Sequence, residues 1–149
     1  MMRALELYRQ LDFDAEKRAE ACIKCSEWMV KAERMEDALT VLWEAEEIYE
    51  CTYGLVDKKT CKIKRDVALL LLKANRYDEA LEEVIAVEEQ EKNLYGETSI
   101  QLGRTYKLIG TLYILRRKPN EARIYLQKAY KIFEMKGASK LVKEVKVKL

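Results

Sequence analysis

A repeat of 42 residues is the feature that most constrains how this chain can fold. Similar phrases recur at this spacing, each with an alanine at the same place: Glu36-Asp37-Ala38-Leu39, Asp78-Glu79-Ala80-Leu81 and Asn120-Glu121-Ala122-Arg123. The same offset aligns Tyr53-Gly54 with Tyr95-Gly96, and it places Arg34, Arg76 and Lys118 just before the three phrases. Self-similarity at a fixed period of about 20 to 50 residues is typical of folds that stack one supersecondary unit on the next.

Each unit has the pattern of two helices joined by a short polar turn. Apolar residues recur at helical spacing in two successive stretches, which in the third unit are Leu102, Tyr106, Ile109 and Tyr113, then Ala122, Leu126, Ala129 and Ile132. Thr98 or Ser99 can cap the first of these helices with a hydroxyl. Pro119 suits the first turn of the second, where no N–H is needed. We predict paired helices at 14–32, 35–51, 57–74, 77–93, 98–116 and 119–135, with flanking helices at about 3–11 and 139–148.

The composition fits a single all-α domain over residues 1–149. The chain is 49% hydrophobic, which is too apolar for a disordered chain, and its 5 Gly and 1 Pro are too few for a many-stranded β fold. No apolar run approaches the roughly 20 residues that span a bilayer. The N-terminus also lacks the pattern of a signal peptide. We therefore expect a cytoplasmic protein without disulfides or a membrane partner.

Few residues offer chemistry. The absence of His excludes His-based triads and His-containing metal sites. No phosphate-binding glycine loop of the common kinds occurs, and acidic runs such as Glu82-Glu83 are typical of a solvated helix face. We predict that the chain is not an enzyme and holds no cofactor.

The cysteines and aromatic residues are assigned to the core. Cys22 and Cys25 form a C-x2-C, but the spacing of Cys51 and Cys61 is wrong for a second half of a zinc site, so no metal is predicted. Both members of the pair fall on core positions of the repeat. Trp28 and most other aromatic residues also fall at or beside core positions, and the alternative is a stacking platform for single-stranded RNA.

These motifs resemble the tetratricopeptide repeat, whose helices carry W-x2-L-G-x2-Y and then A-x3-F-x2-A. The third unit fits best, through Tyr106, Ile109, Gly110 and Tyr113, then Ala122, Leu126 and Ala129. The 42-residue period and the Tyr-Gly pairs resemble the subclass in kinesin light chains, without its usual His-Pro. The resemblance implies a right-handed superhelical stack of about three hairpins, with repeats at about 14–52, 53–94 and 95–136. It also implies that the first helix of each hairpin, helix A, faces a concave groove, while the second is helix B.

The charge is divided along the chain. Residues 95–149 hold 13 Lys and Arg against 4 Asp and Glu, a net charge of +9, whereas residues 1–94 carry a net charge of −7. Such asymmetry steers charged partners toward one end, and it also allows head-to-tail self-association.

The repeat register assigns a basic, partly apolar set of residues to the groove: Lys24, Lys31, Lys62, Arg65, Leu69, Leu72, Lys73, Arg104, Lys107, Leu108 and Thr111, continued by Ile114 and Leu115. Such a surface suits an acidic amphipathic helix or peptide. We therefore expect a scaffold that binds a protein partner. The alternatives are binding of nucleic acid or another acidic polymer by the basic C-terminal half, which we disfavour, and a regulatory segment of a larger protein. The chain could also be a fragment of a longer repeat protein or a short isoform.

Overall fold

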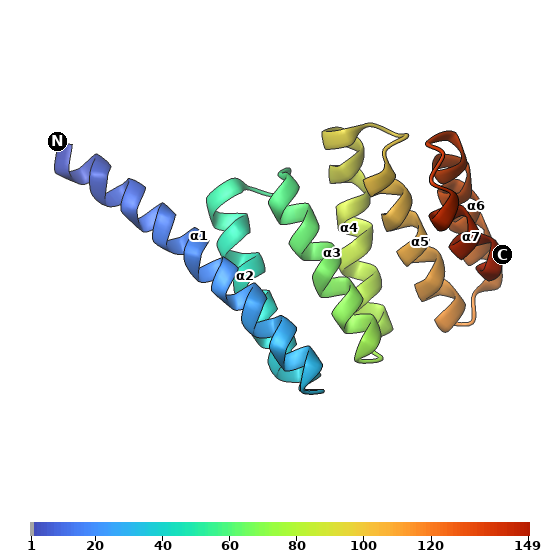
Figure 1. Ribbon diagram of the computed structural model, residues 1–149, viewed down its shortest axis with the longest axis horizontal. Coiled ribbons are helices and arrows are strands. Elements are labelled where there is room, and N and C mark those ends of the chain that lie inside the picture. The colour runs from blue at the N-terminus through green and yellow to red at the C-terminus, as the bar shows by residue number, and fades with distance from the viewer. Residues whose placement is uncertain (1) are drawn as a thin grey trace. The chain divides into compact units, whose positions relative to one another are not determined.

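The computed structural model describes the backbone of residues 2–149 and the side chains of residues 14–149. Over that range it contains seven α-helices and no strand (Figure 1). They are α1 (Met2–Lys31), α2 (Met35–Tyr53), α3 (Lys58–Lys73), α4 (Tyr77–Tyr95), α5 (Ile100–Leu115), α6 (Pro119–Met135) and α7 (Ser139–Lys148). The prediction of an all-α fold built from helical hairpins is confirmed.

The helix boundaries follow local signals in most places. Ser99 caps α5, its hydroxyl accepting a hydrogen bond from the Leu102 N–H at 3.1 Å, and Pro119 begins α6, as predicted. The expected break between helices at 3–11 and 14–32 is absent, because α1 is one helix of 30 residues. No Gly or Pro lies within α1 to stop it.

The turns inside the three hairpins have one backbone conformation. Glu33, Asn75 and Arg117, each 42 residues after the last, have φ angles of 60°, 63° and 60°. The N–H of the following residue donates back to a carbonyl in the last turn of the helix, at 2.8 Å for Arg34, 2.9 Å for Arg76 and 2.9 Å for Lys118. This 6→1 bond satisfies a carbonyl that the helix end would leave unpaired. The repeat is therefore present in the backbone as well as in the sequence.

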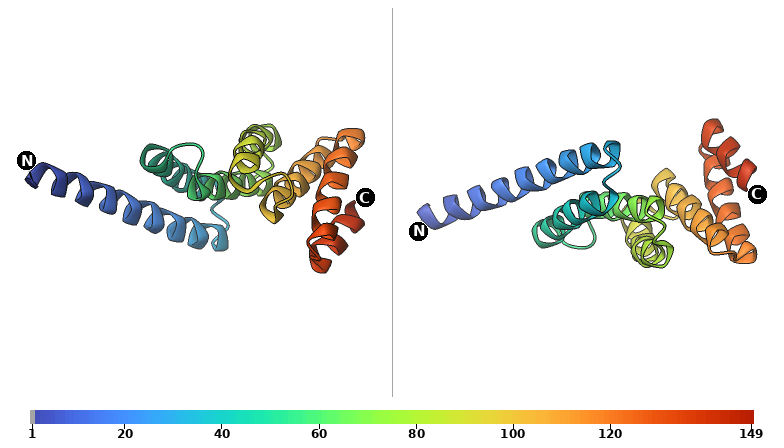
Figure 2. Two further views of the ribbon diagram at one scale, coloured as in Figure 1. Left: turned by 90° about the horizontal axis from the view of Figure 1, so that it is seen from above. Right: turned by 90° about the horizontal axis from the view of Figure 1, so that it is seen from below.

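The chain divides into two compact units, residues 1–63 and 64–149, with the division inside α3. In the first unit α1 packs against α2. In the second, α5 packs against both α4 and α6, and α7 lies along α6 (Figure 2). The expectation of one domain over the whole length stays a prediction.

Small residues set the distance between paired helices. Ala38, Ala80 and Ala122 are buried in helices α2, α4 and α6, as the repeat predicts. A Cβ on Gly110 would lie 2.7 Å from Cγ of Leu126, and one on Gly103 would lie 2.7 Å from Cε1 of Phe133. Both distances are shorter than van der Waals contact, so glycine at these places lets α5 and α6 approach closely.

Candidate functional site

The residues predicted to line a groove are distributed over both units. Lys24 and Lys31 on α1 and Lys62 on α3 belong to the first unit, and all three are exposed. The second unit contains the others, of which Leu69, Lys73 and Arg104 are exposed, Arg65, Leu72, Lys107 and Thr111 are half-buried, and Leu108 is buried. The structure gives three members of the second group partners within the chain, and these partners decide what the surface can offer.

Arg65 is held by a polar cluster at the interface of α3, α4 and α5. Its Nη1 donates a hydrogen bond to the Gln101 carbonyl at 3.0 Å and lies 3.6 Å from Oε1 of Glu91. The Thr105 hydroxyl donates to the other oxygen of Glu91 at 3.0 Å. Glu91 is fully buried, so Arg65 neutralises a carboxylate inside the unit. Arg65 is thus half-buried and already paired with a carboxylate of its own chain.

Burial governs the titration of Glu91. Removal of the carboxylate from water raises its pKa above the ordinary value, and the Arg65 charge and the Thr105 hydrogen bond oppose that rise without cancelling it. The carboxylate is therefore the costly member of the cluster. A role in holding α3, α4 and α5 together explains the cluster without any ligand.

Helix α7 contacts two further residues that were predicted to line the groove. Lys107 forms an ion pair with Glu144, and the Thr111 hydroxyl accepts a hydrogen bond from Nζ of Lys148 at 2.7 Å. The hydrogen bond with Lys107 lowers the pKa of the Glu144 carboxyl, and burial lowers the pKa of Lys148. These contacts tie α7 to α5. Lys107 and Thr111 thus serve the chain's own packing.

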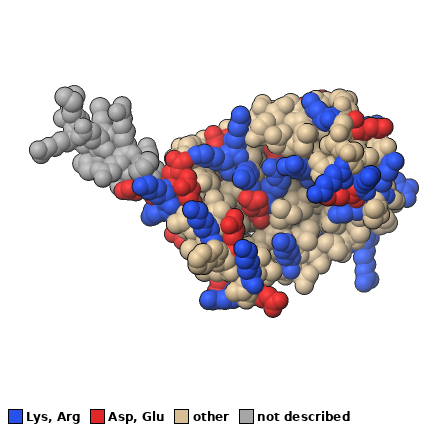
Figure 3. All heavy atoms as spheres, in the orientation of Figure 1, with Lys and Arg blue, Asp and Glu red and all other residues tan. Residues whose placement is uncertain are grey.

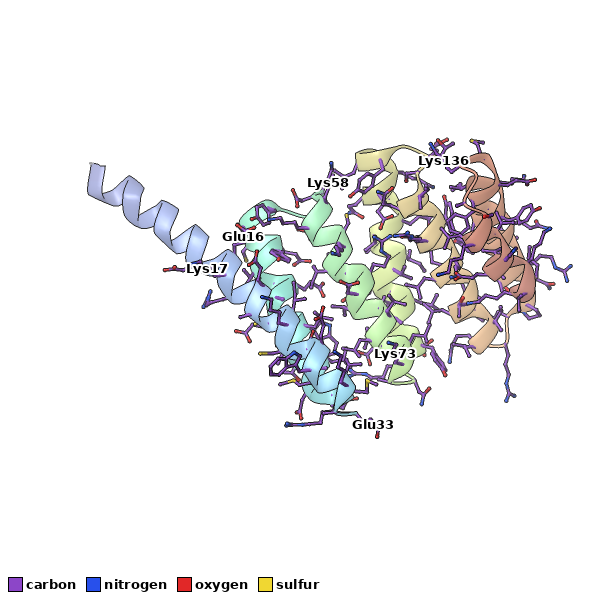
Figure 4. All side chains as sticks on the ribbon, viewed as in Figure 1. Glu16, Lys17, Glu33, Lys58, Lys73 and Lys136 are labelled. Atoms are coloured by element: carbon purple, nitrogen blue, oxygen red, sulfur yellow. The ribbon has the colours of Figure 1, made fainter. Side chains whose placement is uncertain are left out.

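What remains exposed on helices α3 and α5 is a mixed apolar and basic surface, which we call the helix-A face. It consists of Leu69, Lys73, Arg104, Ile114 and Leu115. The three apolar side chains are 43%, 41% and 40% exposed. In the described part of the chain, neither Lys73 nor Arg104 has an ion-pair or hydrogen-bond partner. Lys73 is at the C-terminal end of α3 (Figure 4). Lys and Arg side chains are spread widely over the C-terminal unit in Figure 3.

Two residues assigned to the core from the sequence are at the surface instead. Cys25 is exposed and Trp28 is 76% exposed, so both core predictions are wrong. Cys22 is half-buried beside them, and burial raises the pKa of its thiol. The equivalent residues of the later repeats, such as Leu70 and Leu112, are buried, so the register alone gave no sign of this exposure.

Two findings bear on chemistry and on membranes. Among the residues with described side chains, no three His, Cys, Asp or Glu are grouped so that they could hold a metal ion. None of the described helices is long and apolar enough to cross a membrane.

Comparison with known proteins places these observations in a family. The family model described as tetratricopeptide repeat matches residues 59–135, which is just over half of the chain. No curated protein matches the sequence. Among solved structures, the crystal structure of BtubC (BKLC) from P. vanneervenii is similar with a TM-score of 0.73 at 20% identity. The match covers 89% of this chain and 56% of that one, and at this identity it supports the fold alone.

Proposed function

Because this chain belongs to the tetratricopeptide-repeat family, whose members are generally non-catalytic interaction scaffolds, we propose that it binds an acidic, amphipathic peptide or helix on the helix-A face. The main support for this proposal is the exposure of the apolar side chains on this face. Leu69, Ile114 and Leu115 stand on the helices that the family turns toward its ligands, and each leaves about two fifths of its surface in water. Isolated exposed apolar residues need no explanation, but these three lie on the first helices of two successive hairpins, together with the cations Lys73 and Arg104.

The charges of the helix-A face indicate the sign of the charge that a partner would carry. Lys73 and Arg104 have no partner in the described chain, whereas Arg65 and Lys107 are already paired with carboxylates. The net charge of +9 over residues 95–149 would attract an acidic segment over distances of about 10 Å at moderate salt. In this proposal the apolar side chains supply most of the affinity, and the two free cations supply orientation and association rate.

The test compares two designed peptides of equal length that form amphipathic helices, one of Leu and Glu and one of Leu and Lys. Fluorescence anisotropy with the full chain should show binding of the Leu/Glu peptide only. Leu69→Ala with Ile114→Ala should speed dissociation. Lys73→Glu with Arg104→Glu should slow association and weaken its salt dependence.

The matched control reverses two exposed acids on the outer side of α4, in the variant Glu82→Lys with Glu89→Lys. It changes the net charge by as much as the Lys73/Arg104 variant, with opposite sign, but leaves the helix-A face intact. If this control abolishes binding while the Lys73/Arg104 variant binds normally, the proposed face is wrong. Equal binding of both peptides would show that charge does not select the partner.

A further inference from the structure

One face of α1 is exposed although the repeat buries it everywhere else. We call this face the first-helix seam, and it consists of Arg18, Ala21, Cys25, Trp28 and Ala32, all of them exposed. Their spacings of three and four residues place them along one side of the helix. The equivalents of the first four, 42 and 84 residues later, are Thr60, Ile63, Val67 and Leu70, then Leu102, Thr105, Ile109 and Leu112, all of them buried.

Hydrogen bonds identify what covers this face in the later repeats. The Thr60 hydroxyl of α3 donates to the Tyr49 carbonyl of α2 at 3.3 Å. The Thr105 hydroxyl of α5 donates to Glu91 of α4 at 3.0 Å. In both cases the neighbour is helix B of the preceding hairpin. The first-helix seam is therefore the surface on which a helix A receives a preceding helix B, and in α1 no described helix lies there.

The covering helices share one chemical character. Helix α2 contains six Asp and Glu and no Lys or Arg, and α4 contains seven Asp and Glu and one Lys. The first-helix seam includes Arg18 and is bordered by Lys24 and Lys31, and in the described chain none of the three has an ion-pair partner. Trp28, Lys31 and Ala32 line a shallow surface depression. An acidic helix with apolar residues along one side fits this surface in charge and in shape.

A second copy of this chain does not offer such a helix. Its acidic helices α2 and α4 are already engaged with their own neighbours, α1 and α5. Its C-terminal helices are basic, because α7 contains four Lys and one Glu and α6 contains three Lys and Arg against two Glu. The positive charges of these helices would repel Lys24 and Lys31, and this repulsion would oppose head-to-tail association of two copies.

We propose that the first-helix seam binds an acidic amphipathic α-helix of a partner protein, with Trp28 as the apolar anchor. This surface lies entirely within residues 14–33, so the proposal is independent of the helix-A face. The bound helix continues the packing of the hairpins by one more layer. Exposed tryptophans that become buried at an interface are among the residues whose truncation costs most affinity.

The experiment uses a fluorescein-labelled peptide with the sequence of α4, residues 77–95, as a model of a helix B. Its anisotropy is measured against the full chain. The wild type should bind it, and Trp28→Ala should raise Kd at least about tenfold. Lys24→Glu with Lys31→Glu should also weaken binding, more so at low salt. Ile124→Ala, which truncates an exposed apolar residue on α6, is the matched control and should bind as the wild type does.

Two exposed cysteines provide an internal comparison. Cys25 lies in the first-helix seam and Cys51 lies on α2 outside it. Bound peptide should slow alkylation of Cys25 and leave that of Cys51 unchanged, and Trp28→Ala should remove the protection. In the Lys73→Glu/Arg104→Glu variant, bound peptide should still protect Cys25, because neither residue lies in the first-helix seam. This local readout separates the proposal from binding at the helix-A face.

Several results would overturn the proposal. These are no binding by the wild type, equal binding by Trp28→Ala, or equal binding of a peptide whose four central glutamates (82, 83, 88 and 89) are replaced by lysine. Sedimentation that shows a dimer of the wild type, dissociated by Trp28→Ala, would assign the first-helix seam to a second copy instead.

Discussion

Glu91 of α4 and Phe133 of α6 occupy the same position of the repeat, 42 residues apart, and both are fully buried. Glu91 meets Arg65 and the Thr105 hydroxyl. Phe133 lies against Gly103, where a Cβ would come within 2.7 Å of its ring. At this repeat position α5 therefore meets a charged, hydrogen-bonded neighbour on α4 and a closely packed aromatic neighbour on α6.

The difference shows what each interface depends on. A buried ion pair has lost its hydration, so it is stable only while every partner is present. A packed aromatic residue has no such condition, but it tolerates little change in volume. The same repeat position can therefore be satisfied in two ways that fail under different changes.

The largest expected effect follows from removal of one member of the polar interface. Arg65→Ala leaves the Glu91 carboxylate buried without a cation, and we expect it to lower the free energy of unfolding by about 3 to 5 kcal/mol. Urea denaturation followed by circular dichroism measures this loss. Arg65→Met with Glu91→Leu replaces the whole pair by apolar groups and should be within about 1 kcal/mol of the wild type, or more stable. A double variant as unstable as Arg65→Ala would refute the account.

The packed interface is tested by an added methyl group. Gly103→Ala should lower the free energy of unfolding by about 1 to 3 kcal/mol, because the new Cβ would overlap the Phe133 ring and Cγ2 of Ile132. Helix propensity alone predicts the reverse, a gain of about 1 kcal/mol. Thermal unfolding decides between them. In a Phe133→Leu background the penalty of the alanine should shrink, since the smaller side chain leaves room for it.

Sequence reasoning succeeded where the cause is local or periodic. The Ser99 cap and the Pro119 helix start depend on a few neighbouring residues, and the burial of Ala38, Ala80 and Ala122 follows from the repeat itself.

Sequence reasoning missed the contacts and exposures that depend on a neighbouring side chain or helix that the repeat register does not specify. The pairing of Arg65 was not foreseen, because it depends on an acid at position 91, where the other repeats have an aromatic residue. Helix α7 engages Lys107 in the same way. Trp28 has a core position but no covering helix among the described residues, and a single-repeat pattern contains no information about which neighbours are present.

The polar interface should also respond to pH, whereas the packed one should not. Burial raises the pKa of Glu91 above its ordinary value of 4.5, so the folded chain binds this proton more tightly than the unfolded chain does. The stability contributed by this group should therefore increase as the pH falls through the raised pKa and become constant below about 4.5. The measurement is the unfolding free energy of the wild type minus that of Glu91→Gln between pH 7 and 4. A difference that falls with decreasing pH would contradict the sign.

The smallest expected effect comes from the hairpin turns, where the three repeats share a backbone and differ only in side chain. Glu33, Asn75 and Arg117 all adopt positive φ, which costs an ordinary L residue about 1 kcal/mol and costs glycine little. Arg117→Gly should therefore raise the free energy of unfolding by roughly 0.5 to 1 kcal/mol, less the extra backbone entropy that glycine gives the unfolded chain. Asn75→Gly should gain less, since asparagine visits this conformation more readily than most residues do. Lys118→Gly is the control with φ of −118°, where glycine relieves nothing and should be neutral or destabilising. An equal response of Arg117 and Lys118 to glycine would mean that the positive φ of the turn has no measurable cost.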